Sequence, residues 1–294
     1  GGDTNNAARV RRYLPLGLAD EAVALLTVGD LRRWRDALLQ SMTPASANRT
    51  GTALRAALNM AAAHDERIES RRAWETGLAN IPDVTQSRNV ILDEEMVRRL
   101  IVEAAAQCPE FGLLVEMAAV TGARVSQLRR LEVQDLQADR ADARLLMPCS
   151  RKGRGVKDIT RRPVPIPLGL ARKLSGLAAD KAPSSPLLRR NDCQPWSPSE
   201  HQRPFRRTAK AAGLDPAEVT IYALRHSNIV RQILAGVPIR VVAVNHDTSV
   251  TMIERTYSRY IGDHADHLAR AALLDTTAPA GGNILPMRAS APSE

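Results

Sequence analysis

The chain has 294 residues, a formal net charge of +9 at pH 7 and a sequence pI near 10.1. This length exceeds one average domain, so we expect two domains, each with its own core. The basic surplus favours a polyanionic partner such as DNA, RNA or an anionic membrane surface, although basic proteins without such a partner also occur. No apolar run approaches the roughly 20 residues of a membrane span, which excludes transmembrane helices.

The positive charge is carried almost entirely by arginine and lies mostly in the second part of the chain. Residues 1–88 hold 12 basic and 10 acidic side chains, a surplus of 2, whereas residues 89–294 hold 29 basic and 22 acidic ones, a surplus of 7. We therefore expect the tighter phosphate contacts in the second part. Arginine suits forked hydrogen bonds to phosphate oxygens, although a GC-rich genome produces the same bias.

The sequence carries no motif for a metal or a nucleotide cofactor. Cys108, Cys149 and Cys193 are odd in number and lack C-x-x-C spacing, which argues against a disulfide framework and a zinc site. The six histidines form no H-E-x-x-H pattern, and no Walker A or G-x-G-x-x-G sequence occurs. We therefore expect no metal and no cofactor.

Helical periodicity dominates the first part of the chain. It predicts amphipathic helices over residues 26–39 and 45–65 and a third over residues 67–78. Residues 1–80 are therefore expected to form a small helical domain. Residues 81–90 contain a proline and several polar turn formers, and this composition predicts a linker.

The second part is expected to contain helices and one small sheet. A helical pattern resumes at residue 93, continues to residue 120 and is broken by Thr121-Gly122. Residues 144–148 and 162–167 predict two short strands, which flank a basic, glycine-containing hairpin tip. The prolines of the second strand restrict it to a sheet edge.

Further helices are expected after the hairpin. Ser197-Pro198 is typical of a helix start, and helical patterns follow over residues 222–235, 249–260 and 264–274. The fold class is thus mainly α with a small antiparallel β-sheet, with a second domain over residues 91–274. Residues 275–294 are rich in Pro, Ala, Gly and Ser and are expected to be disordered.

Two arginines follow chain breaks at expected helix starts. Arg124 comes after Thr121-Gly122, and Arg225 comes after Asp215-Pro216. Helix starts present unpaired N–H groups and a positive dipole end, so an arginine there reinforces an anion site. For either arginine alone, a surface salt bridge would be the commoner role, and its significance comes from the surrounding pattern.

Three segments resemble the tyrosine recombinase (phage integrase) family. They are TGARVSQL at residues 121–128, YALRH at 222–226 followed by GVP at 236–238, and TSVTMIERTY at 248–257. The resemblance covers roughly residues 26–274 and is least specific in the first domain. It implies a helical core-binding domain that grips DNA, joined to a mixed α/β catalytic domain.

The resemblance implies that Arg124 and Arg225 clamp the scissile phosphate, where two guanidiniums can neutralise developing charge. Lys152 matches the family's mobile lysine and would protonate the leaving 5′ oxygen, with Lys157 as its rival. His246 matches the third phosphate-binding residue. Further contacts to the DNA backbone are expected from five basic residues: Arg49, Arg55, Arg151, Arg154 and Lys157.

Tyr257 matches the family's nucleophile, which forms a 3′-phosphotyrosine and frees a 5′ hydroxyl, so that religation requires no ATP. Tyr260 is the competitor, because it lies three residues later on a neighbouring face of the same helix. Without the motif, either tyrosine would be read as an ordinary packing residue. His226 is a possible accessory residue that could bond the phosphate or a structural carbonyl.

Two positions depart from the family pattern. The usual histidine before Leu-Arg is Tyr222, and the usual acid three residues after the first arginine is Gln127. Tyr222 can still donate a hydrogen bond and Gln127 can still accept one. The departures are compatible with slower cleavage, with a different proton path or with an inactive paralogue.

The resemblance predicts a site-specific recombinase or integrase of bacterial or phage origin, cytoplasmic and associated with the nucleoid. Its expected partner is a double-stranded DNA recombination site, on which four copies assemble from free monomers, without a membrane. The helix at residues 264–274 is a candidate for docking on a neighbouring copy. The alternatives are a catalytically inactive DNA-binding paralogue and a DNA-relaxing enzyme like the type IB topoisomerases.

Overall fold

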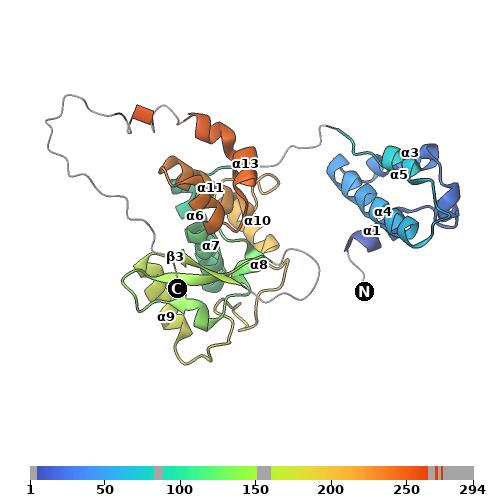
Figure 1. Cartoon of the computed structure of the whole chain (residues 1–294). Helices are drawn as coiled ribbons and strands as arrows, with labels where there is room; N and C mark the ends of the chain where they lie inside the picture. Colours follow the sequence, from blue (N-terminus) through green and yellow to red (C-terminus); the bar gives the residue numbers. More distant parts are fainter. Residues whose placement is uncertain (1–4, 83–88, 151–159, 264–268, 271–272, 274–294) are drawn as a thin grey trace, which may run out of the picture. The chain divides into compact units, whose positions relative to one another are not determined.

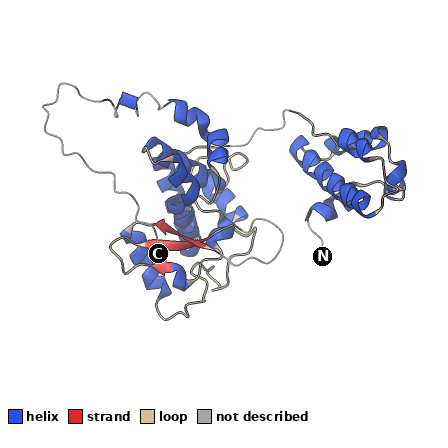
Figure 2. Ribbon diagram, in the orientation of Figure 1, coloured by secondary structure: helices blue, strands red, loops and turns tan. Residues whose placement is uncertain are grey.

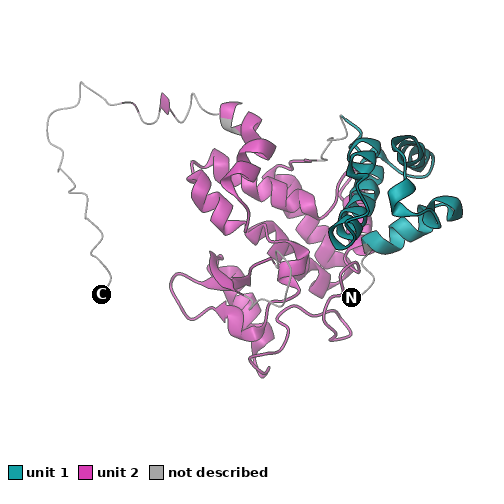
Figure 3. Ribbon diagram, turned by 45° about the vertical axis from the view of Figure 1, so that its right-hand side comes forward, with its two compact units in different colours: residues 1–88 teal, residues 89–294 magenta. Residues whose placement is uncertain are grey.

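The computed structural model describes residues 5–82, 89–150, 160–263, 269–270 and 273. The chain folds into two compact units, Gly1–Arg88 and Asn89–Glu294 (Figure 3). Most of the expected linker, the tip of the expected hairpin, most of the helix expected at 264–274 and the whole expected tail lie outside the described residues.

The described part of the first unit is helical. Its α-helices are α1 (Asn5–Tyr13), α2 (Leu16–Ala19), α3 (Val28–Ala37), α4 (Pro44–His64) and α5 (Arg71–Gly77). Thr27 begins α3 through a capping box, because its hydroxyl accepts from the Asp30 N–H while the Asp30 carboxylate accepts from the Thr27 N–H. Thr43 caps α4, in which Pro44 is the first residue and needs no hydrogen-bond acceptor.

Two tryptophans anchor the core of this unit. Trp74 of α5 is fully buried and donates its indole N–H to Asn59 Oδ1 at 2.7 Å. Trp34 of α3 is 4% exposed and donates to the carbonyl of Tyr13 at 2.7 Å. These bonds satisfy both indole N–H groups, so burial of the rings stabilises the packing of α3 on α5 and of α1 on α4.

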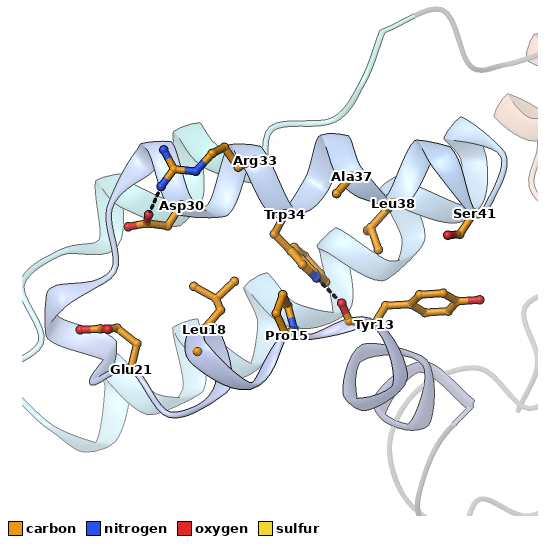
Figure 4. A pocket seen from close by; sticks show the side chains of 11 residues that line it. Tyr13, Pro15, Leu18, Glu21, Asp30, Arg33, Trp34, Ala37, Leu38 and Ser41 are labelled. Carbon is orange, nitrogen blue, oxygen red and sulfur yellow. Dashed lines mark hydrogen bonds and ion pairs between the residues drawn. The ribbon is translucent and has the colours of Figure 1, made fainter.

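A surface cavity of about 610 Å³ lies beside Trp34 in the first unit (Figure 4). Leu18 and Leu38 contribute apolar walls, while Asp30 and Arg33 form an ion pair at 2.5 Å. The cavity is lined by no histidine, cysteine or lysine. Of the residue types in the predicted site it therefore offers one arginine, Arg33, and one tyrosine, Tyr13, without the histidine and the lysine.

The second unit combines helices with one sheet (Figures 1 and 2). Its described α-helices are α6 (Glu94–Gln107), α7 (Pro109–Thr121), α8 (Val125–Leu128), α9 (Leu168–Ala178), α10 (Gln202–Ala211), α11 (Tyr222–Leu234), α12 (Ile239–Asn245) and α13 (Val250–Asp263). Its described strands are β1 (Leu136–Gln137), β2 (Arg144–Pro148) and β3 (Arg161–Pro165). The predicted fold class, mainly α with a small antiparallel sheet, is confirmed.

The sheet has the order β1-β2-β3, and both pairs are antiparallel. Leu145 of β2 lies between Leu136 of β1 and Val164 of β3, and both Leu145 and Val164 are buried. The proline-rich strand β3 is at the edge, as predicted, because proline cannot donate to a second neighbour. The two-residue strand β1 was not predicted.

Several predicted helix limits are wrong. The pattern over residues 93–120 is two helices, because Cys108 is extended and Pro109 starts α7 as its first residue. The helix expected at Ser197-Pro198 begins only at Gln202, because Ser197 and Glu200 form a turn in which the Ser197 N–H donates to the Glu200 carboxylate. Helices α9 and α12 were not predicted.

The second unit has two apolar cores. The larger one joins α6, α7, α9 and α10 to the sheet. The smaller one lies between α11, α12 and α13, where Ile253 and Tyr257 pack against Ile229 and Val230. Helix α11 also packs on α7, so it connects the smaller core to the larger one and fixes the position of α13.

Candidate active site

Arg225 lies in the first turn of α11, and its side chain is held from both sides. One Nη donates to the Gly122 carbonyl at 2.9 Å and the other donates to the His246 carbonyl at 2.6 Å. The residue is only 3% exposed. Burial and the nearby charge of Arg124 lower the pKa of Arg225 to about 10, so the guanidinium remains charged at neutral pH.

Gly122 ends α7 in the left-handed region, with φ of +59°. A Cβ atom at this position would lie 2.3 Å from Cε1 of His246, so only glycine leaves room for the imidazole. The His246 ring is fully buried, and its Nε2 lies 3.1 Å from Nε2 of Gln232. Burial, followed by the charge of Arg225, lowers the pKa of His246 to about 3, and the ring is neutral.

Arg124 precedes α8 and is partly buried. One Nη donates to Ser150 Oγ at 3.1 Å and to the Asp247 carbonyl at 3.3 Å, and it lies 3.7 Å from Oδ2 of Asp247. Gln127 supports this arrangement, because its Oε1 accepts from the Arg124 backbone N–H at 3.0 Å while its Nε2 donates to the Pro148 carbonyl at 2.9 Å. Gln127 is fully buried.

Tyr257 projects from α13 toward α11. Its Oη lies 2.6 Å from Nδ1 of His226, and the tyrosine is 4% exposed. Burial raises the pKa of the Tyr257 phenol, although the charge of Arg225 opposes this rise. Burial, followed by the charge of Arg225, lowers the pKa of His226 to about 4. Tyr260 is half-buried and its hydroxyl bonds instead to Arg259.

Tyr222 lies at the exposed edge of this cluster. It is 43% exposed, its ring meets that of His226 edge to face at 4.9 Å, and the guanidinium carbon of Arg225 lies 5.9 Å from its ring centroid. The ring therefore covers part of the arginine and histidine pair, while its hydroxyl end can face solvent.

The structure brings together seven of the predicted site residues through the contacts described above: Arg124, Gln127, Tyr222, Arg225, His226, His246 and Tyr257. Four others, Arg151, Lys152, Arg154 and Lys157, lie outside the described residues. Arg49 and Arg55 belong to α4 of the first unit, where neither is fully buried.

Sequence reasoning missed Asp247, which contacts both Arg124 and Gln127. The one sequence signal that could have indicated Asp247 is its position directly after His246. Among the described residues no cluster of histidine, cysteine and carboxylate side chains could hold a metal ion. The three cysteines are free thiols. No helix in the described part of the chain is long and apolar enough to cross a bilayer.

A mainly helical unit with a small antiparallel sheet and a cluster of arginine, histidine and tyrosine side chains is the arrangement expected of a tyrosine recombinase. The pattern that defines the Phage integrase family matches residues 91–261. The chain therefore belongs to the phage integrase family of tyrosine recombinases.

Comparisons with individual proteins agree with this membership. The chain is 27% identical over 199 residues to tyrosine recombinase XerA of Pyrococcus furiosus, a match that covers 66% of each chain and thus just under two thirds of that relative. The Tn1549 transposon integrase, solved with transposon right-end DNA, has a TM-score of 0.70 at 16% identity, covering 91% of this chain and 92% of that one.

Lambda integrase, solved as a dimer on a COC′ core site, has a TM-score of 0.62 at 19% identity. That match covers 84% of this chain and 86% of the lambda chain. At these levels of identity, the two solved structures show the shared fold.

Proposed function

We propose that this protein is a site-specific DNA recombinase that cuts and rejoins strands through a 3′-phosphotyrosine intermediate, without metal or ATP. The observation that carries the proposal is the contact of Tyr257 Oη with His226 Nδ1 at 2.6 Å. His226 directly follows the buried Arg225 in the sequence. A phenol held against a proton acceptor beside a fixed cation has the groups needed to attack a phosphodiester.

Arg124 and Arg225 bind the non-bridging oxygens of the scissile phosphate in this proposal. Both guanidiniums are already oriented by backbone carbonyls, so little reorganisation is needed when DNA binds. The His246 carbonyl orients Arg225, while the expected contact of the His246 imidazole with phosphate stays a prediction. A preorganised pair of cations stabilises charge as it develops on the phosphorane.

His226 supplies the base that position 222 lacks. Because the low pKa of His226 keeps the imidazole neutral at pH 7, its Nδ1 can accept the phenolic proton as Tyr257 Oη bonds to phosphorus. The bond to the 5′ oxygen then breaks, and that oxygen takes a proton from Lys152, with Lys157 as the alternative donor. Since Tyr257 is buried, the phenol must become exposed before it reaches the phosphate.

The proposed partner is a double-stranded DNA site on which four copies of the chain assemble. The net charge of +9 supports a polyanionic partner. Lambda integrase has been solved as a tetramer bound to a Holliday junction, with a TM-score of 0.60 to this chain. Strand exchange by this protein would pass through the same kind of four-way junction.

The proposal is tested with a nicked suicide duplex that carries the recombination site, identified by selecting bound fragments of the source genome. We expect the wild-type chain to form a covalent protein–DNA adduct, Tyr257→Phe to form none and Tyr260→Phe to retain it. An adduct that persists in Tyr257→Phe and disappears in Tyr260→Phe would reassign the nucleophile. Tight DNA binding without any adduct would indicate the inactive paralogue, and relaxation of supercoiled DNA by a monomer would indicate the topoisomerase-like enzyme.

A further inference from the structure

Four consecutive carbonyls, those of residues 244–247, accept hydrogen bonds from three arginines of different elements. Arg162 from β3 donates to the first two, at 2.7 Å to the first. Arg225 from α11 donates to the third at 2.6 Å, and Arg124 before α8 donates to the fourth at 3.3 Å. This 244–247 turn therefore links a strand of the sheet to both proposed phosphate-binding arginines.

These guanidiniums repel one another in a poorly solvated place. Arg162 is 9% exposed and Arg225 is 3% exposed. Burial lowers the pKa of both, and the charge of Arg124 lowers each further. Carbonyl dipoles orient cations but bring no net charge, so a buried group of this kind needs a compensating anion.

Asp247 is the carboxylate that the 244–247 turn itself supplies. Its residue adopts φ of +48°, a left-handed conformation in which aspartate and asparagine are tolerated. Oδ2 accepts from the Ser150 backbone N–H at 2.6 Å and lies 3.4 Å from Gln127 Nε2 and 3.7 Å from an Arg124 Nη. Its charge also raises the pKa of Arg162.

The Asp247 carboxylate and Arg124 both contact Ser150. Ser150 follows β2, and its Oγ accepts from Arg124 at 3.1 Å while its N–H donates to Asp247. The side chain of Gln127, at the position where the family has an acid, contributes an amide to the same group. The negative charge that the family pattern puts at position 127 is thus present at Asp247.

We propose that Asp247 is a positioning residue for strand cleavage, which holds Arg124 and Ser150 in place with the negative charge that Gln127 lacks. Asp247 acts through Arg124 and does not itself contact the DNA. The inference rests on the proposed function, since its main measurement is the rate of adduct formation.

The test is Asp247→Asn, which keeps the size and the backbone conformation of the residue and removes its charge. We expect adduct formation on saturating suicide DNA to slow at least tenfold, while the Kd for DNA changes less than twofold. Asp180→Asn is the matched control, because Asp180 is exposed, has φ of +61° and loses the same charge. It should match the wild type in both measurements.

Moving the negative charge from position 247 to position 127 by mutation distinguishes a positioning role of Asp247 from a purely structural one. Gln127→Glu alone should slow cleavage, because it places a second carboxylate where Nε2 now lies 3.4 Å from Asp247. When Gln127→Glu is added to Asp247→Asn, adduct formation should be at least threefold faster than in Asp247→Asn alone, because the carboxylate introduced at position 127 would restore the negative charge. Recovery remains partial, because the hydrogen bond to the Pro148 carbonyl is lost.

Two results would overturn the inference: wild-type cleavage by Asp247→Asn, or a further fall in rate when Gln127→Glu is added to it. If the wild-type chain forms no adduct on its site, the proposed function fails by itself. The contact of Asp247 with Arg124 is then tested by urea unfolding. The shifts in the urea midpoint caused by Asp247→Asn and by Arg124→Gln must be non-additive in the double variant. Additive shifts would overturn it.

Discussion

Gly122→Ala tests the placement of His246 against the end of α7. The new methyl group would lie 2.3 Å from Cε1 and 2.8 Å from Nδ1 of His246, and 3.0 Å from Oδ1 of Asn228. None of these atoms is the free end of a flexible side chain, because His246 is fully buried and Asn228 is 1% exposed. The imidazole must therefore move, and the backbone carbonyls that hold Arg225 are displaced with it.

The expected loss of stability has two parts. A non-glycine residue in the left-handed region costs about 1–2 kcal/mol. Forcing an extra methyl group into a close-packed core costs a further ~1–3 kcal/mol. Gly122→Ala should therefore reduce the free energy of unfolding of the second unit by about 2–5 kcal/mol. Gly213→Ala is the matched control, because Gly213 has φ of +82° but nothing within 4 Å of its Cβ position.

Native-state hydrogen exchange read by mass spectrometry measures this difference. Peptides from α7 and α11 report the second unit, while peptides from α4 report the first unit and should be unchanged in both variants. We also expect Gly122→Ala to slow adduct formation at least tenfold, because Arg225 loses its fixed acceptor. If Gly122→Ala destabilises the second unit no more than Gly213→Ala does, the packing of His246 on Gly122 is refuted.

Three further predictions concern charge, acid stability and the first unit. Arg225→Lys cannot bond both carbonyls at once, and should slow adduct formation about 100- to 1,000-fold, measured in single turnovers. His226 and His246 have folded pKa values of about 4 and about 3, below the unfolded value of 6.5, so their contribution to stability is complete above pH 6.5. Each should lower the free energy of unfolding by up to ~1.4 kcal/mol per pH unit as the pH falls toward 4. Urea unfolding at a series of pH values measures this dependence. The prediction is contradicted if the free energy of unfolding of the His226→Gln variant depends on pH as steeply as that of the wild type. Trp74→Ala should lower the free energy of unfolding that hydrogen exchange reports for α4 by about 3–5 kcal/mol, while the value for α7 stays unchanged. Equal losses in α4 and α7 would contradict this prediction.

The sequence predicted the fold class because the signals are local. Amphipathic periodicity repeats within one or two turns of a helix, and prolines marked the edge strand. The break at Cys108 was missed because apolar residues continue across it, although Pro109 carries the signal. The strand β1 is too short to show any period, and it exists because β2 offers it a partner.

The residues of the candidate site could be named from the sequence, but the contacts among them could not. Arg124, Arg225 and Tyr257 stand in recognisable segments, whereas the pairing of His226 with Tyr257 depends on how α13 packs on α11. No spacing within either helix encodes that contact. The contact of Asp247 with Arg124 joins residues 123 positions apart, and it becomes visible only when the 244–247 turn is folded against the end of β2.

In the proposed reaction, the charge balance of the cluster favours a phosphorane over a ground-state phosphodiester. Arg124, Arg162 and Arg225 bring three positive charges and Asp247 one negative charge, a surplus of two among the described residues of the cluster. The low pKa values of the two histidines keep both rings neutral at pH 7. A phosphodiester carries one negative charge, whereas the phosphorane formed when the Tyr257 phenol attacks and gives its proton to His226 carries two. In the proposed reaction the surplus of two, to which His226 adds the proton that it accepts, stabilises the transition state more than the bound substrate, which is the condition for catalysis by preorganised charge.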